Sequence, residues 1–162
     1  MKIGIGKRII GSFIFVILLF SISIATAYFV MKDITDAVNE VRLMARRVDL
    51  SGDLQLNLNK LLSPVSEYIM EGDPAERDHY DRYITEIFTT LEELKQHKGD
   101  SRWDKMLTDV NKDAIELGTM SIEVLYIERP MGNKKVAALM KEIYSFSEKV
   151  IEEAEEFHNL TV

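Results

Sequence analysis

The chain has 162 residues, of which 46% are hydrophobic and 29% charged, and it contains no cysteine. Without cysteine there can be no disulfide, no thiolate catalysis and few kinds of structural zinc site. Residues 1–31 carry three basic groups and no acid, whereas the other 131 residues carry 17 basic and 27 acidic groups, a net charge of −10. An acidic body of this kind repels nucleic acid and anionic lipid surfaces, which argues against a nucleic-acid-binding role.

Residues 9–31 form an uncharged run of 23 residues rich in Ile, Phe, Leu and Val. At about 1.5 Å of rise per residue, a helix of this length crosses a hydrocarbon core of roughly 30 Å. Lys7 and Arg8 precede the run, so the positive-inside rule places residues 1–8 in the cytoplasm and the remaining chain outside. The sequence therefore predicts a transmembrane helix over 9–31, with the lipid bilayer as its first partner.

A cleaved signal peptide is the alternative interpretation of this run. The N-terminus is basic, and Ala25-Thr26-Ala27 matches an A-x-A cleavage site after Ala27. Against cleavage, the apolar run is longer than the usual 7–15 residues and continues past Ala27. Both interpretations place the body of the protein outside the cytoplasm.

The region after the apolar run has a coiled-coil pattern whose phase changes once. Ile34, Val38 and Val41 begin a seam of alternating four- and three-residue steps that continues through Ala45 and Val48. The next seam position would be Gly52, whereas the apolar set restarts at Leu54. We interpret residues 32–52 as a membrane-proximal helical stalk and residues 53–162 as an extracytoplasmic domain, and we expect a kink near Pro64.

Three turns divide residues 53–162. In the first, Gly72 is suited to closing a helix, Asp73 to capping the next one, and Glu76 to completing a capping box. Ser101 is the expected cap of a third helix, and Arg129–Asn133 is the expected third turn.

The predicted fold class is all-α, with an N-terminal transmembrane helix continuing into an up-down-up-down antiparallel four-helix bundle. The four helices are expected at about 53–71, 74–98, 101–128 and 133–160. No segment shows the sustained period-2 alternation of a strand. The expected inward-facing residues are Leu54, Leu58, Leu61, Val65, Tyr68, Tyr80, Ile84, Ile87, Leu91, Leu94, Trp103, Leu107, Val110, Ala114, Leu117, Ser121, Val124, Val136, Met140, Ile143, Val150, Ala154 and Phe157.

The histidines do not suggest a catalytic or metal site. Glu76/His79 and Glu155/His158 have the Glu-x-x-His spacing of carboxylate di-iron bundles. In the expected topology the two pairs lie about 30 Å apart along the helices, so we interpret each as a solvated surface pair. Together with His97 they offer no plausible Ser-His-acid triad. We therefore predict that the protein is not an enzyme and has no catalytic, cofactor or metal residues.

Two groups of polar residues were considered for ligand binding. Arg42, Arg46 and Arg47 could bind a carboxylate or phosphate, although pairing with acids of an extended fourth helix is the simpler interpretation. Thr119 and Ser121 could line a pocket or could be tolerated small residues of the third helix. The sequence does not identify the ligand or the residues that bind it.

One turn carries a family resemblance. Tyr68 and Gly72-Asp73-Pro74, within the segment Leu61–Arg77, resemble the corresponding turn of the four-helix-bundle sensor domain of methyl-accepting chemotaxis proteins. Related CHASE-type helical sensor domains of histidine kinases carry a similar Tyr-Leu-x-x-Gly-Asp-Pro turn. The resemblance implies a homodimeric receptor in the bacterial inner membrane, with a periplasmic bundle that binds an unknown small-molecule or protein ligand.

On this basis the sequence predicts the ligand-sensing input module of a chemotaxis-type receptor, acting in signal transduction. The chain is expected to be cut before a second transmembrane helix and an output domain. One alternative is the sensor region of a membrane histidine kinase. Another is a stand-alone bitopic membrane protein whose bundle binds a protein partner.

Overall fold

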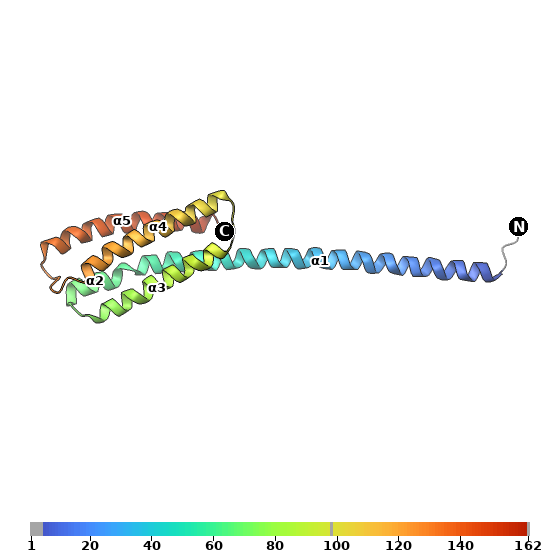
Figure 1. Ribbon diagram of the computed structural model, residues 1–162, viewed down its shortest axis with the longest axis horizontal. Helices are drawn as coiled ribbons and strands as arrows, with labels where there is room; N and C mark the ends of the chain where they lie inside the picture. Colours follow the sequence, from blue (N-terminus) through green and yellow to red (C-terminus); the bar gives the residue numbers. More distant parts are fainter. Residues whose placement is uncertain (1–4, 98, 162) are drawn as a thin grey trace. The chain divides into compact units, whose positions relative to one another are not determined.

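The computed structural model describes residues 5–97 and 99–161, apart from the side chains of residues 5 and 7–9. Five helices account for most of this part of the chain, and no strand occurs within it (Figure 1). The helices are α1 (Ile5–Lys60), α2 (Leu62–Glu71), α3 (Ala75–Gln96), α4 (Ser101–Leu125) and α5 (Lys134–Asn159). The all-α class is thus confirmed. The chain divides into two compact units, unit 1 up to Leu43 and unit 2 from Met44 onward.

Unit 1 contains the apolar part of α1. The large apolar side chains from Ile10 to Met31 are 48–72% exposed, and nothing in the unit covers them. Among the described residues, α1 is the one helix that is long and apolar enough to cross a membrane. Lys2, and the side chains of Lys7 and Arg8, lie outside the described residues, so the orientation that they suggest stays a prediction.

The disruption expected near Pro64 takes the form of a helix break at Leu61. Pro64 has no backbone N–H for the carbonyl of Lys60 four residues earlier, and its ring crowds that carbonyl. Accordingly α1 ends at Lys60, and the Leu61 N–H instead donates to the Leu58 carbonyl at 3.3 Å. Helix α2 then begins at Leu62.

Packing in unit 2 begins before residue 53. Leu50 and Ser51 are already buried, and the helix runs without interruption through Gly52. Leu50 lies four residues before Leu54 and so extends the same apolar stripe by one turn. The change of phase that we read from the sequence therefore marks where core-facing side chains begin and does not interrupt the helix.

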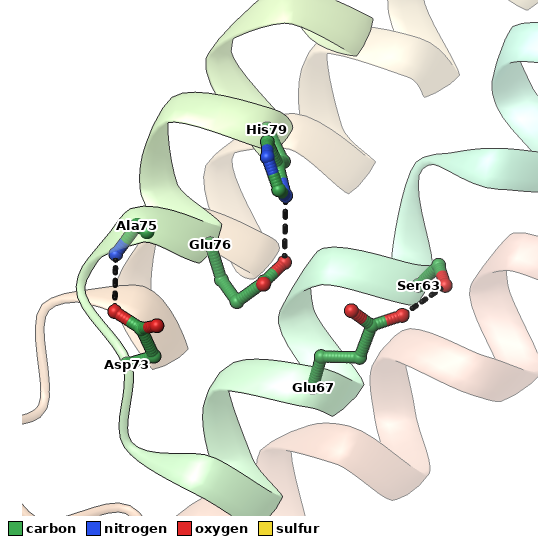
Figure 2. A network of polar contacts seen from close by, with 6 residues as sticks. All are labelled: Ser63, Glu67, Asp73, Ala75, Glu76 and His79. Carbon is green, nitrogen blue, oxygen red and sulfur yellow. Dashed lines mark hydrogen bonds and ion pairs between the residues drawn. The ribbon is translucent and has the colours of Figure 1, made fainter.

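The first turn matches the sequence in two of its three features. Gly72 has φ +71°, and its N–H donates to the Tyr68 carbonyl at 2.8 Å, which closes α2. The Asp73 carboxylate accepts a hydrogen bond from the Ala75 N–H at 2.9 Å at the start of α3. The predicted capping box does not form, because the Glu76 carboxylate contacts His79 instead of the Asp73 backbone (Figure 2).

Helix α4 is capped one residue earlier than predicted. Asp100 is the N-cap, with an extended backbone, and its carboxylate accepts a hydrogen bond from the Trp103 N–H at 2.8 Å. Ser101 is consequently the first helical residue, so the prediction of a Ser101 cap was wrong. At the start of α5 the Asn133 side chain accepts from the Lys135 N–H at 2.9 Å, where the sequence places the end of the third turn.

Helix α4 has the most packing partners in unit 2, since it packs against α2, α3 and α5. Helices α2 and α3 also pack against each other. Of the 23 residues expected to face inward, all are buried except Ile84, which is partly buried against the core. The core also includes Leu50, Leu62 and Leu125, which the apolar stripes read from the sequence did not contain.

Candidate functional site

The two Glu-x-x-His pairs are unlike each other. In Figure 2, Glu76 and His79 face each other on one side of α3, with Glu76 Oε2 and His79 Nδ1 3.2 Å apart. Glu76 is buried while His79 is exposed, so the expected solvated pair is only half solvated. His158 does not pair with Glu155 within the described structure. Its Nδ1 lies 2.8 Å from the hydroxyl of the fully buried Ser51.

The Ser51–His158 contact belongs to a small polar cluster between α1 and the end of α5. The Ser51 hydroxyl also lies 3.0 Å from the Val48 carbonyl and 2.8 Å from the Thr161 hydroxyl. Because Ser51 has no exposed surface, it cannot meet a substrate as a nucleophile. No group of three or more His, Cys, Asp or Glu side chains in the described residues could hold a metal ion. The cluster therefore joins α1 to the end of α5, and its serine is not accessible as a nucleophile.

The three arginines considered for anion binding occupy different surroundings. Arg46 pairs with Glu93 of α3 at 2.5 Å, whereas we had expected its partner on the fourth helix. The Arg47 guanidinium lies over the Trp103 ring at 5.3 Å from its centre. Arg42 is an exposed residue of unit 1, so the structure does not join the three into one site.

The two small polar residues of α4, Thr119 and Ser121, both donate to their own helix, and Ser121 lies beside a buried tyrosine. The buried Ser121 donates to the Leu117 carbonyl, and the exposed Thr119 to the Ile115 carbonyl. Beside them, the Tyr80 hydroxyl of α3 donates to the Gly118 carbonyl at 3.0 Å. Burial raises the pKa of Tyr80 to about 12, although a hydrogen bond with Ser121 acts in the opposite direction.

A buried carboxylate on α4 has an ion-pair partner on α5. Asp113 Oδ2 lies 2.6 Å from Lys149 Nζ, and Lys149 is also 3.3 Å from Glu153. Burial raises the Asp113 pKa, but the hydrogen bonds with Lys149 and Glu153 outweigh it and hold the pKa below its usual value. Burial and the neighbouring Asp113 raise the pKa of Glu153. This cluster fixes α5 against α4 at mid-length.

An open, mostly apolar cavity of unit 2 lies between α2, the start of α5 and the loop that precedes α5. Its volume is about 420 Å³, within the roughly 300–1,000 Å³ range of small-molecule sites. Apolar side chains form most of its lining, including Ile69, Met70 and Met140. Its polar lining comes from Ser66, Asn133, Lys134 and Tyr144. The size and lining of this cavity suit a mostly apolar small molecule.

The two hydroxyls in the lining join the helices on either side of the cavity. Ser66 Oγ of α2 lies 2.7 Å from the Tyr144 hydroxyl of α5. Ser66 also donates to the Leu62 carbonyl at 3.0 Å, so its single proton is used and Tyr144 is the donor in the pair. Both protons are therefore engaged within the protein, and the hydroxyl pair offers only acceptor positions to a ligand.

Lys134 is the one charged residue among those described in the lining. It is the first residue of α5, whose first turn contains no acid. Its neighbour Lys135 is paired with Glu123 at 2.8 Å, whereas Lys134 has no ion pair within the described part of the chain. The cavity thus has an unpaired cation at one end and a hydroxyl pair at the other. The two ends lie ten residues, or about 15 Å, apart along α5.

No family model, curated protein or solved structure matches this chain. The cavity was not anticipated from the sequence, because it forms where residues 78 positions apart meet, as Ser66 and Tyr144 do. A weak local signal existed in Ser66 and Ala137. Each of these small residues follows a core position, Val65 or Val136, and so could leave space beside the core.

Proposed function

We propose that this chain is the ligand-sensing input module of a bacterial transmembrane receptor, of the type found in methyl-accepting chemotaxis proteins. The observation that carries the proposal is a helix with a long uncovered apolar stretch, which leads into an acidic helical unit containing an apolar cavity. The apolar stretch suits an anchor in the inner membrane. Unit 2 then lies in the periplasm as an up-down-up-down four-helix bundle, with the N-terminus in the cytoplasm.

The hydroxyl groups of the apolar stretch support the membrane assignment. Ser21, Ser23 and Thr26 each donate to the carbonyl four residues earlier, at 2.9–3.0 Å. Their hydrogen bonds are completed within the helix, as the interior of a bilayer requires. The apolar side chains around them need a nonaqueous environment, because an exposed apolar surface of this extent is rare in soluble monomers.

The contacts of α5 support a signalling mechanism. Helix α5 contacts α2 through Tyr144 and Ser66, beside the cavity, and near its C-terminal end it contacts α1 through His158 and Ser51. A ligand in the cavity would alter the first contact and shift α5 by an ångström or two, a known class of switching transition. In the proposed receptor this shift passes to a second transmembrane helix and an output domain, and the module works as a homodimer.

The proposed dimer contact is the exposed part of the coiled-coil seam, from Ile34 to Ala45. Ile34, Val38 and Val41 are 50–66% exposed in a single chain and have coiled-coil spacing. In the membrane, Val38→Cys should form a disulfide between two chains on mild oxidation. Glu40→Cys is the matched control, because Glu40 lies between Val38 and Val41 in the sequence but on a different face of the helix. Equal cross-linking of the two variants would contradict a dimer through this seam.

Labelling with a membrane-impermeant maleimide tests the topology, since the chain has no native cysteine. In intact cells with a permeabilised outer membrane, Glu71→Cys should react, because Glu71 is exposed in unit 2. Lys2→Cys should react only after lysis. The reverse pattern, or a soluble chain, would rule out the proposed receptor.

A protein-binding bitopic membrane protein is a second candidate, favoured by one observation on α4. Ile115 and Ile122 of α4 and Tyr126, its C-cap, are 43–73% exposed and lie seven and four residues apart in the sequence. Exposed apolar residues that share a helix face are typical of protein contact surfaces. Replacing Ile122 by Glu would abolish binding of a partner at this surface, whereas it should leave a receptor that senses through the cavity unaffected.

A further inference from the structure

We infer that the cavity between α2 and α5 binds a small, elongated apolar molecule with a single anionic head group, an apolar monocarboxylate, whose anion pairs with Lys134. This inference rests on the proposed function, because it names the class of ligand that the input module would sense. The apolar part of the argument is the lining, in which Ile69, Met140 and their neighbours would bury the body of the ligand.

The position of the charge follows from the two polar ends of the cavity. The Ser66–Tyr144 pair uses both of its protons within the protein, so it has no donor for an anion. Lys134 has three donors and a positive charge, and no acid among the described residues neutralises it. An anion is therefore stabilised at the Lys134 end, where the N-terminus of α5 adds a favourable field.

The net charge of unit 2 and the single lysine in the lining favour a ligand with one negative charge. Its 15 basic and 24 acidic residues give a net charge of −9, which opposes the approach of any anion. A single lysine in the lining can balance one negative charge, whereas a dianion would keep one charge unpaired beside apolar walls. A cation would find no carboxylate in the lining, only the neutral oxygens of the hydroxyl pair as acceptors, and Lys134 would repel it.

Three probes with the same apolar body test the charge selectivity: 4-phenylbutanoate, 4-phenylbutan-1-ol and 4-phenylbutylamine. The full chain is placed in lipid nanodiscs, and saturable binding is measured by calorimetry after subtraction of empty nanodiscs. We expect the carboxylate to bind about tenfold more tightly than the amine, which corresponds to one charge-assisted contact. Equal affinities, or no saturable binding of the carboxylate, would overturn the inference.

Two pairs of variants locate the binding. Lys134→Gln should weaken carboxylate binding about tenfold and leave the alcohol unchanged, whereas Lys135→Gln, whose lysine pairs with Glu123, should change neither. Ala137→Leu places a larger side chain in the cavity and should abolish binding of both. Its control is Ala138→Leu, since Ala138 lines a separate groove between α4 and α5. Indistinguishable results within either pair would contradict the assigned site.

The maleimide experiment separates failure of this inference from failure of the receptor proposal. If Glu71→Cys is labelled from outside but 4-phenylbutanoate does not bind, the ligand class is wrong and the membrane-anchored module stands. If the labelling fails, the receptor proposal is wrong whatever the cavity binds. Both Ala137 and Ala138 are exposed, so the leucine variants should fold. The fluorescence of Trp103 checks that they do.

Discussion

Along α1, the hydroxyls of Ser23 and Thr35 in unit 1 and of Ser51 in unit 2 form different kinds of hydrogen bond. In unit 1, Ser23 and Thr35 are exposed and donate to carbonyls of their own helix. In unit 2, Ser51 of the same helix has no exposed surface, and its hydroxyl contacts the side chains of His158 and Thr161. Local hydrogen bonds suit a helix whose surroundings offer no partners, whereas cross-helix bonds specify one particular packing.

The exposure of apolar side chains also differs between the two units. Leu18 and Leu19 of unit 1 are about half exposed, while Leu54 and Leu58 of unit 2 are almost fully buried. Leu18 and Leu19 are favourably placed only if the surrounding solvent is itself apolar, as a bilayer is. Leu54 and Leu58 are instead removed from water by neighbouring side chains. Substitutions of equal chemistry should therefore have different consequences in the two units.

The largest difference is expected for charges placed on exposed leucines. The double variant Leu18→Asp/Leu19→Asp should lose membrane association, because each central aspartate costs about 3 kcal/mol of insertion free energy. Leu56→Asp/Ile115→Asp changes two residues of unit 2 that are 50% and 49% exposed, and it should leave membrane association intact. Alkaline carbonate extraction distinguishes the two variants. Retention of the first double variant in the membrane fraction would refute the anchor.

A cavity-forming substitution is expected to have the next largest effect. Leu58→Ala should lower the free energy of unfolding of unit 2 by about 2–5 kcal/mol, since Leu58 is 1% exposed in the core. Leu43→Ala, at a half-exposed position of unit 1, should change it by less than about 0.5 kcal/mol. Denaturant titration followed by Trp103 fluorescence measures both, because Trp103 is the single tryptophan and its ring contacts Phe157. Equal effects would mean that α1 does not contribute to the core as described.

Burial of Tyr80 should make the free energy of unfolding of unit 2 fall with pH in the alkaline range. Its folded pKa of about 12 lies above the unfolded value near 10, so the unfolded chain ionises first as the pH rises. The associated stability is complete below pH 10 and is lost between about pH 10 and pH 12, by at most roughly 2–3 kcal/mol. Tyr80→Phe should remove this pH dependence from denaturation curves. If the variant and the parent chain lose stability in parallel, the Tyr80 side chain is not buried as described.

The sequence was sufficient to predict most residues of the core, because the apolar spacing of an amphipathic helix survives packing. Leu58, Ile87 and Phe157 all followed from a period of 3.6 residues and are fully buried or nearly so. The all-α class followed for the same reason. The cap of α4 was placed one residue late because Asp100 and Ser101 can both cap, and only the extended backbone of Asp100 decides between them.

The cavity and the buried ion pair could not be predicted, because both depend on which helix faces meet. Asp113 looks like an ordinary surface residue in the sequence, and its burial depends on Lys149 of α5 lying beside it. His158 was assigned to a surface pair with Glu155 by its spacing, although it points toward Ser51 of α1. Spacing along one helix identifies neighbours on that helix, but it does not identify the partner supplied by another helix.

The smallest effect is expected for the removal of single serine hydroxyls from α1, which tests the difference between Ser51 and Ser23. Ser51→Ala should destabilise unit 2 by about 1–3 kcal/mol, because it removes the hydroxyl that His158 Nδ1 contacts and one of the two partners of the Thr161 hydroxyl, which also donates to the His158 carbonyl at 2.6 Å. Ser23→Ala should change stability by less than about 0.5 kcal/mol, since the Leu19 carbonyl that accepts its hydrogen bond keeps its place in the helix ladder. Thermal unfolding in nanodiscs, read through Trp103, compares the two. A loss for Ser51→Ala as small as that for Ser23→Ala would show that this cluster does not fix the end of α5 to α1, and the route proposed for a ligand signal would then have to leave α5 elsewhere.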